Sequence, residues 1–157
     1  MSTETAVAPI VRTITVNRPV EEAFRIFTEE MAAWWPLDQY SRAYAEHRGT
    51  DVTSETVVVE GHVGGRIYEV LSNGEQTSWG EVLVWEPSGR VVYAWKPHSR
   101  PIPATEVEVT FTPEGDRTRV VLEHRGWERV GDAAPDGRET YARGWPLVLA
   151  SFERAAT

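Results

Sequence analysis

The residues best suited to chemistry in this sequence are aromatic rings. The chain has seven tryptophans and five tyrosines but no cysteine, which excludes thiolate nucleophiles, thiolate zinc sites and disulfides. Large rings with a polar edge serve cores, ligand pockets and interfaces alike. If the fold encloses an internal space, the rings expected to form its apolar wall are Trp34, Trp35, Tyr68, Trp79, Tyr93, Trp95, Tyr141 and Trp145. Such a wall is typical of a small-molecule site, and the competing interpretation is a filled core.

A few ionisable side chains could act beside such a wall, namely Glu60, Arg66, Glu69, Glu81, Glu123 and His124. A buried carboxylate with a raised pKa can serve as a general acid or base, and a histidine can do so near neutral pH. The alternative is that these charges pair across strands or face solvent, as alternation on a sheet favours. We assign no catalytic residue, and we add Glu81 and His124 to the eight rings as predicted ligand contacts.

Other kinds of site find little support. The four histidines, His47, His62, His98 and His124, form no ligand pair at helical spacing, so no metal site is predicted. The glycines between Gly61 and Gly65 are not followed by a phosphate-loop lysine, and no serine stands in a nucleophile-elbow motif. The sequence therefore predicts no metal, no cofactor and no hydrolase chemistry.

Composition limits the partners. The net charge of -8 opposes binding to nucleic acid, and no apolar run approaches the roughly 18 residues that would insert into a membrane. Met1 to Pro9 contain no basic residue and no apolar run, so a signal peptide is not expected and the cytoplasm is the expected location. The length of 157 residues predicts one domain over residues 10–157, preceded by a flexible N-terminus over residues 1–9.

The elements that must position these residues begin with a strand over Ile10 to Val16, where apolar residues alternate. A helix should follow, because Pro19 suits a first helical position and apolar residues then recur at helical spacing. A second short helix is expected from Met31 to Trp35, ended by Pro36. The polar stretch from Gln39 to Ser54 has no clear period and predicts a loop, which could serve as a flap.

Six further extended segments are separated by turn signals such as Asn73-Gly74. They span about residues 55–60, 66–71, 77–86, 90–96, 104–112 and 118–125. Consecutive hairpins predict a curved antiparallel sheet of about seven strands, and the alternation from Val107 to Phe111 gives it one buried face. The apolar spacing from Tyr141 to Phe152 predicts a long terminal helix covering that face, kinked at Pro146. A shorter helix beginning at Pro146 is the alternative.

The direction of the central rings follows from strand parity. Tyr93 and Trp95 share a face with Val91, and we expect this face to point inward. On the preceding segment, parity places Trp79, Glu81, Leu83 and Trp85 together. Either Glu81 then points inward or both tryptophans point outward, and the sequence does not decide between these two arrangements.

Several motifs, in this order, resemble the family named after the activator of the ninety-kilodalton heat-shock chaperone's ATPase, within the START-like (SRPBCC) superfamily. They are Trp34-Trp35-Pro36, the run from Gly64 to Glu69, the run from Trp79 to Pro87, Arg90 to Trp95, Thr118 to Trp127, and Tyr141 with Gly144-Trp145. The resemblance covers roughly Val11 to Phe152. It implies an α+β helix-grip fold with a cavity between the sheet and the terminal helix, and it implies no single activity.

The leading hypothesis is that the chain binds a small hydrophobic or amphipathic molecule, such as a lipid, a polyketide or an aromatic metabolite, in this cavity. The first alternative is a cavity enzyme of the cyclase or aromatase type that uses His124 or a buried glutamate. The second is a stress-related co-chaperone or interaction module with Trp85 or Trp127 exposed as anchors. This short chain lacks the second domain of the true chaperone activators, so a chaperone partner is not favoured. Both a monomer and a homodimer remain open.

Overall fold

A computed structural model describes residues 7–157 of the chain. The elements in chain order are β1 (Ile10–Val16), α1 (Val20–Thr28), α2 (Met31–Trp34), α3 (Arg42–Glu46), β2 (Ser54–Val59), β3 (Arg66–Leu71), β4 (Gln76–Glu86), β5 (Arg90–Trp95), β6 (Thr105–Glu114), β7 (Arg117–Arg125), the 3-10 turns η1 (Trp127–Arg129) and η2 (Gly131–Ala133), and α4 (Ala134–Ala155). Most of the predicted flexible N-terminus over residues 1–9 lies outside the described residues. No described helix has the length and apolar character needed to cross a membrane.

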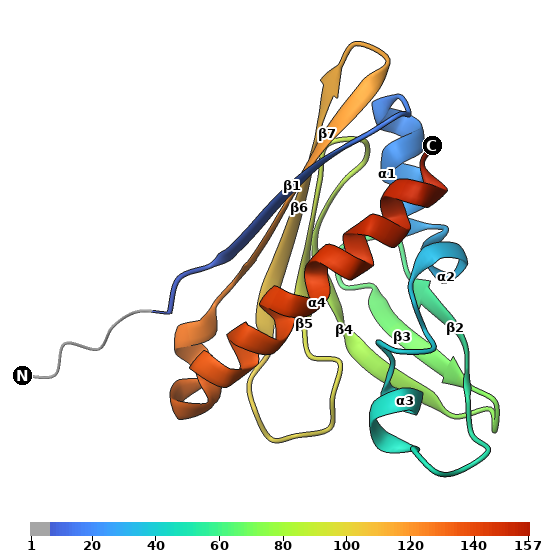
Figure 1. Ribbon diagram of the computed structural model, residues 1–157, viewed down its shortest axis with the longest axis vertical. Helices are drawn as coiled ribbons and strands as arrows, with labels where there is room; N and C mark the ends of the chain where they lie inside the picture. Colours follow the sequence, from blue (N-terminus) through green and yellow to red (C-terminus); the bar gives the residue numbers. More distant parts are fainter. Residues whose placement is uncertain (1–6) are drawn as a thin grey trace, which may run out of the picture.

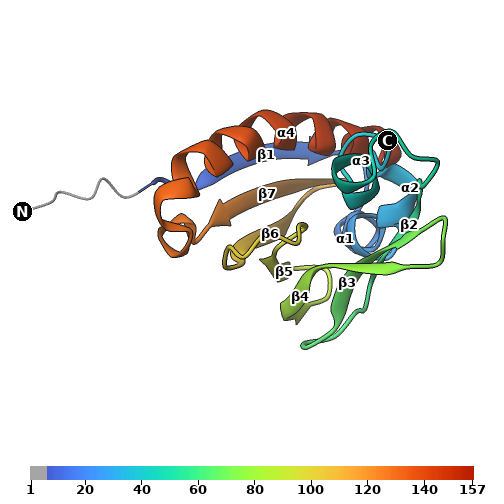
Figure 2. The ribbon, with the colours of Figure 1, turned by 90° about the horizontal axis from the view of Figure 1, so that it is seen from below.

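The strands form one antiparallel sheet of seven strands in the order β1-β7-β6-β5-β4-β3-β2. From β2 to β7, strands that are consecutive in the chain are neighbours in the sheet. The first strand, β1, pairs with the last strand, β7, and forms the edge opposite β2. The sheet curls, and the long helix α4 runs diagonally across its inner face (Figures 1 and 2). The predicted α+β helix-grip fold with a curved sheet of seven strands is therefore confirmed.

Strand alternation fills the space between sheet and helices. Val107, Val109 and Phe111 on β6 are buried as predicted, and Leu122 on β7 continues the same layer. They pack with apolar residues of α1 and α4, including Phe152, which is fully buried. The inner face of the sheet therefore presents a largely apolar surface to the helices.

The terminal helix continues through Pro146, so the prediction of a long helix is confirmed and the short alternative is wrong. Proline has no backbone N–H, which leaves the carbonyl one turn earlier, at Ala142, without its usual helical donor. Arg12 Nη2 on β1 donates to that carbonyl at 3.3 Å. The interruption in α4 is thus used to fasten the helix to the edge strand.

The stretch from Gln39 to Ser54 contains the helix α3, so the prediction of a loop throughout is wrong. Ser41 is its N-cap, and the Ser41 side chain accepts a hydrogen bond from the backbone N–H of Tyr44 at 3.0 Å. This short helix is stabilised by the capping contact and by a carboxylate from a residue distant in sequence. Periodicity alone does not reveal a helix of five residues.

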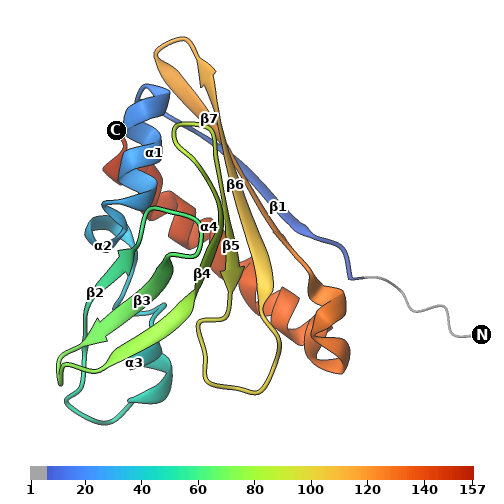
Figure 3. The same ribbon diagram turned by 180° about the vertical axis from the view of Figure 1, so that it is seen from behind.

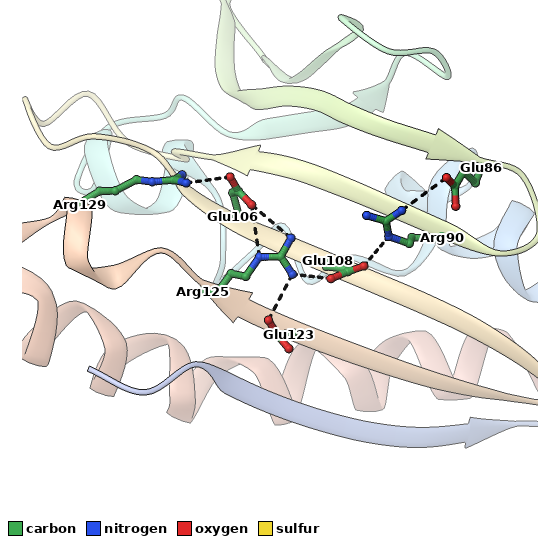
Figure 4. Close-up of polar contacts among 7 residues, drawn as sticks. All are labelled: Glu86, Arg90, Glu106, Glu108, Glu123, Arg125 and Arg129. Atoms are coloured by element: carbon green, nitrogen blue, oxygen red, sulfur yellow. Dashed lines mark hydrogen bonds and ion pairs between the residues drawn. The ribbon is translucent and has the colours of Figure 1, made fainter. Parts of the chain in front are cut away.

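The outer face of the sheet carries ion pairs, and no described helix covers it (Figure 3). Arg125 on β7 binds Glu106 and Glu123 at 3.2 Å and also pairs with Glu108. Arg90 donates to the other oxygen of Glu108 (Figure 4). Burial acts to raise the pKa of Glu108, but the hydrogen bonds from Arg125 and Arg90 outweigh it and hold that pKa below its usual range. These charges tie β5, β6 and β7 together.

Replacing Arg125 with methionine should lower the free energy of unfolding by about 2 kcal/mol at pH 7, because three partly buried carboxylates lose their shared donor. The matched change Arg143→Met removes an exposed pair with Glu139 and should cost less than about 0.5 kcal/mol. Urea unfolding of both variants gives these values. The Arg125→Met effect should shrink as the pH falls through the lowered pKa of Glu108, since the protonated acid loses its charge. Equal costs for both variants would contradict a special role for the outer network.

Candidate functional site

A cavity of about 240 Å³ opens between the middle of α4, the strands β4 and β5, and the segment that follows α2. Its lining is mostly aromatic and apolar. The residues that line it are Trp35, Gln39, Tyr40, Ser41, Ala45, Trp79, Trp95, Pro97, Thr140, Tyr141, Gly144, Trp145 and Val148. None of these described lining residues carries a formal charge at neutral pH, so the site suits an uncharged ligand.

Four tryptophans, Trp35, Trp79, Trp95 and Trp145, form what we call the tryptophan box. The ring centroids of Trp35 lie 5.1 Å from Trp79, 5.9 Å from Trp95 and 5.9 Å from Trp145. Trp95 lies 5.8 Å from Trp145 and 5.9 Å from Trp79. These distances suit edge-to-face and tilted packing of aromatic rings, so the box is a packed unit rather than a chance grouping. All four rings line the cavity.

Trp79 reaches the box because β4 departs from regular pairing. Ile67 pairs with Gly80 and Tyr68 with Ser78, which leaves Trp79 as the extra residue of a β-bulge. Gly80 has φ of 152°, and a Cβ there would lie 1.8 Å from the carbonyl oxygen of Ala94. Only glycine fits such a close approach between two strands.

The bulge also determines which side chains of β4 point inward. Trp79 is buried, whereas Glu81 is exposed on the outer face. A second irregularity at Leu83 shifts the register again, so Trp85 pairs with Val91 and faces inward. Glu81, predicted as a ligand contact, therefore lies outside the lining of this cavity, because simple alternation does not hold across two bulges.

Tyr68 does not border the cavity either. The inward positions of β3 are Ile67, Glu69 and Leu71, which are all fully buried. Tyr68 lies on the opposite face, where the Arg66 guanidinium stands 4.3 Å from the ring centroid. This cation–π contact belongs to the outer surface of the sheet.

His124 lies behind the tryptophan box rather than in the cavity lining. Trp145 Nε1 donates to His124 Nδ1 at 3.0 Å, and His124 Nε2 lies 2.7 Å from Thr105 Oγ1. An indole N–H can only donate, so Nδ1 is unprotonated and the neutral ring carries its proton on Nε2. The Nε2–H then donates to Thr105, whose hydroxyl donates to the Trp95 carbonyl at 3.3 Å. Both ring nitrogens are thus occupied.

Burial lowers the pKa of His124 to about 3. The ring is fully buried and packs against Trp127 and Tyr141, with centroids at 4.4 and 4.8 Å. A histidine with this pKa does not exchange protons with a substrate near neutrality. The geometry makes His124 a support that orients Trp145, and it does not favour the hypothesis of His124 as a general acid or base.

Glu69 is a fully buried carboxylate near the cavity, and it holds one wall of the cavity in place. Its carboxylate accepts from Arg42 N at 2.8 Å, from Ala43 N at 3.1 Å and from Trp79 Nε1 at 2.9 Å. The first two donors are the opening N–H groups of α3, which have no partner within the helix. One side chain therefore joins the stretch from Gln39 to Ser54, which we call the flap segment, to the sheet and to the tryptophan box.

The remaining predicted contacts divide between cavity wall and core. Tyr141 lines the cavity. Trp34 and Tyr93 are buried beside the box: Trp34 packs 5.7 Å from Trp35, and Tyr93 stacks on Trp95 at 6.3 Å. The inward direction of Tyr93 and Trp95 is as predicted.

Sequence reasoning missed Tyr40, Ser41 and Ala45, which line the cavity from the flap segment. The Tyr40 carbonyl accepts from Trp35 Nε1 at 2.7 Å, so this segment is tied to the box at a second point. The suggestion that Trp127 is an exposed anchor is wrong, because this residue is buried under α4. Trp85 is half-buried and packs edge-on against Phe24 at 5.2 Å.

The family model described as Activator of Hsp90 ATPase homolog 1-like protein matches residues 17–157. This chain belongs to the Activator of Hsp90 ATPase homolog 1-like protein family. The resemblance inferred from the motifs is thereby confirmed. No curated protein sequence matches the chain.

Solved structures related to this member of the Activator of Hsp90 ATPase homolog 1-like family include two above 25% identity. An anthrahydroquino-Gama-pyrone synthase, Txn09, complexed with SUM, is 32% identical, with 83% of this chain and 84% of that chain covered and a TM-score of 0.56. The self-sacrificing resistance protein CalC from Micromonospora echinospora is 28% identical, with 95% and 94% covered and a TM-score of 0.70. The Aha1 dimer from Colwellia psychrerythraea shares the fold at 18% identity, with 96% of each chain covered and a TM-score of 0.57.

The stability of this family member should depend on pH through His124. The unfolded chain binds a proton below the ordinary pKa of 6.5, whereas the folded chain does not bind it until about pH 3. The free energy of unfolding should therefore fall as the pH drops from 6.5, by up to about 1.4 kcal/mol per pH unit. The variant His124→Gln cannot titrate and should show a smaller slope in urea unfolding between pH 6.5 and 5. Identical slopes would refute a buried neutral histidine.

Glu69→Gln should loosen the flap segment, because an amide replaces one of the two accepting oxygens of the carboxylate with an NH2 group that can only donate. We expect a loss of about 1–3 kcal/mol in the free energy of unfolding and faster amide hydrogen exchange over residues 42–46. The exposed Glu75→Gln on the β3–β4 turn is the matched control and should change neither quantity. Unchanged exchange in Glu69→Gln would show that other contacts hold α3.

Proposed function

We propose that this protein binds an uncharged, planar, polycyclic aromatic molecule in the cavity bounded by the tryptophan box. The observation that carries the proposal is the set of four packed indoles around a cavity of about 240 Å³. Flat rigid rings make a wall that complements other flat rings, and they lose little entropy on binding. An extended lipid chain would gain less from such a wall.

The size of the cavity supports a ligand of two or three fused rings. A cavity of about 150 Å³ holds a single benzene ring, and sites for drug-sized molecules begin at about 300 Å³. The volume of about 240 Å³ lies between these limits. A larger molecule would extend out of the cavity past an exposed lining residue such as Ala45.

One relative supports this choice of ligand. The synthase at 32% identity carries a name that describes a fused aromatic ring system. Its name also favours the second candidate function, a cavity enzyme that closes or aromatises rings. The described lining offers Tyr141 and Ser41 but no carboxylate or histidine to move protons, so binding is the function that the geometry supports better.

Filling the cavity from the flap side tests the proposal. Ala45 is exposed and lines the cavity, so Ala45→Leu places extra apolar volume where the ligand would lie. We expect the dissociation constant of a tricyclic aromatic probe, 9-fluorenone, measured by quenching of tryptophan fluorescence, to rise at least about tenfold. The matched control Ala33→Leu alters an exposed alanine of the short helix α2 outside the lining and should bind normally.

Two results would overturn the proposal. The first is a failure of the unaltered protein to bind any tricyclic aromatic at its solubility limit. The second is equal weakening by Ala45→Leu and Ala33→Leu, which would place the probe elsewhere. Ring closure by the unaltered protein on a linear polyketide-like substrate would instead establish the enzyme candidate.

A further inference from the structure

Among residues 7–157, six of the seven tryptophans are buried, and the N–H groups of five have protein acceptors. These acceptors are the Ile26 carbonyl for Trp34, the Tyr40 carbonyl for Trp35, the Glu69 carboxylate for Trp79, the His124 carbonyl for Trp127 and the His124 ring for Trp145. Trp95 is the exception. Its Nε1 is buried with no hydrogen-bond partner in the described part of the chain.

The exception lies at the functional site. Trp95 is 3% exposed and lines the cavity. Its ring is held by Trp79, Trp145 and a stacked Tyr93, so it has little freedom to turn toward another acceptor. A buried donor without a partner costs about 1–3 kcal/mol, and folded proteins satisfy nearly all such groups. A ligand that reaches this unpaired donor would therefore recover that cost.

A second donor lies nearby. Burial raises the pKa of Tyr141 to about 12, while the neighbouring Trp95 indole N–H and the charge of Arg100 act in the opposite direction, so the phenol keeps its proton. The Trp95 N–H therefore lies near the Tyr141 hydroxyl, but the two do not form a hydrogen bond of regular geometry. Two neighbouring donors favour a ligand atom that only accepts.

We infer that the aromatic ligand carries a ring ketone or quinone oxygen that accepts a hydrogen bond from Trp95 Nε1. This inference rests on the proposed function and makes Trp95 the residue that determines ligand specificity. A carboxylate would be buried without a cation, because no charged side chain is among the described lining residues. A phenol would need an acceptor for its own proton, whereas a ketone needs only a donor.

The test uses fluorene and 9-fluorenone, which share one tricyclic skeleton and differ by a single ketone. Dissociation constants of both probes are measured for the unaltered protein, for Trp95→Phe and for Tyr141→Phe. The selectivity is the ratio of the two constants. We expect Trp95→Phe to reduce the selectivity for 9-fluorenone about tenfold, since a hydrogen bond is worth about one factor of ten in affinity. Tyr141→Phe should reduce the selectivity by a smaller factor, because it removes the second donor and leaves the Trp95 N–H in place.

The outcomes separate the two claims. Binding of both probes with a selectivity that Trp95→Phe leaves unchanged would overturn the ketone inference and leave the proposed function standing. Loss of selectivity in Tyr141→Phe alone would assign the role to the phenol and overturn the role of Trp95. Binding of neither probe by the unaltered protein would overturn both claims.

A measurement on the unaltered protein keeps the inference testable if Trp95→Phe does not fold. In a ¹⁵N-¹H correlation spectrum, one indole N–H signal, assigned to Trp95 by its nuclear Overhauser contacts, should move downfield with 9-fluorenone and not with fluorene. Equal shifts of that signal with both probes would overturn the inference.

Discussion

A buried chain of hydrogen bonds holds the terminal helix at a fixed position on the sheet. It runs from the Trp145 indole through the His124 ring and the Thr105 hydroxyl to the carbonyl of Trp95. Two members of the tryptophan box therefore stand at the two ends of one polar chain. In a low-dielectric interior such a chain is costly to break, because each freed group loses its partner without gaining water. The position of α4, and with it one wall of the cavity, depends on this constraint.

Glu69 has the corresponding role on the opposite wall. Its carboxylate joins the start of α3 to Trp79, so the flap segment and the box cannot move independently. Polar anchors on both sides explain how a domain with so many large rings retains a cavity. Apolar contacts alone are not directional and would favour collapse to close packing, whereas directed hydrogen bonds fix the orientation of the Trp35, Trp79 and Trp145 rings.

The fold followed from the sequence where the local pattern agreed with the tertiary structure. Three features depend only on residues that are neighbours in the chain. They are the alternation at Val107 and Val109, the glycine turns, and the apolar spacing in the last helix. Alternation failed on β4, where Trp79 and Glu81 diverge because of bulges. The pair Trp79-Gly80 held a signal for this, since a glycine inside a strand often marks a bulge. The roles of Glu69 and His124 could not be predicted, because they depend on partners distant in sequence.

The tryptophan box joins Trp35 to Trp145, which are 110 residues apart in the chain. The pairing of β1 with β7 also joins segments that are distant in the chain, since β1 has no neighbouring strand until β7 has been made. Contacts between such distant segments slow folding. A ribosome that adds about 5–20 residues per second needs roughly 5–20 s to make the intervening chain. Throughout that time the early tryptophans lack their final neighbour, so the nascent chain has no completed cavity in which a ligand could assist its folding.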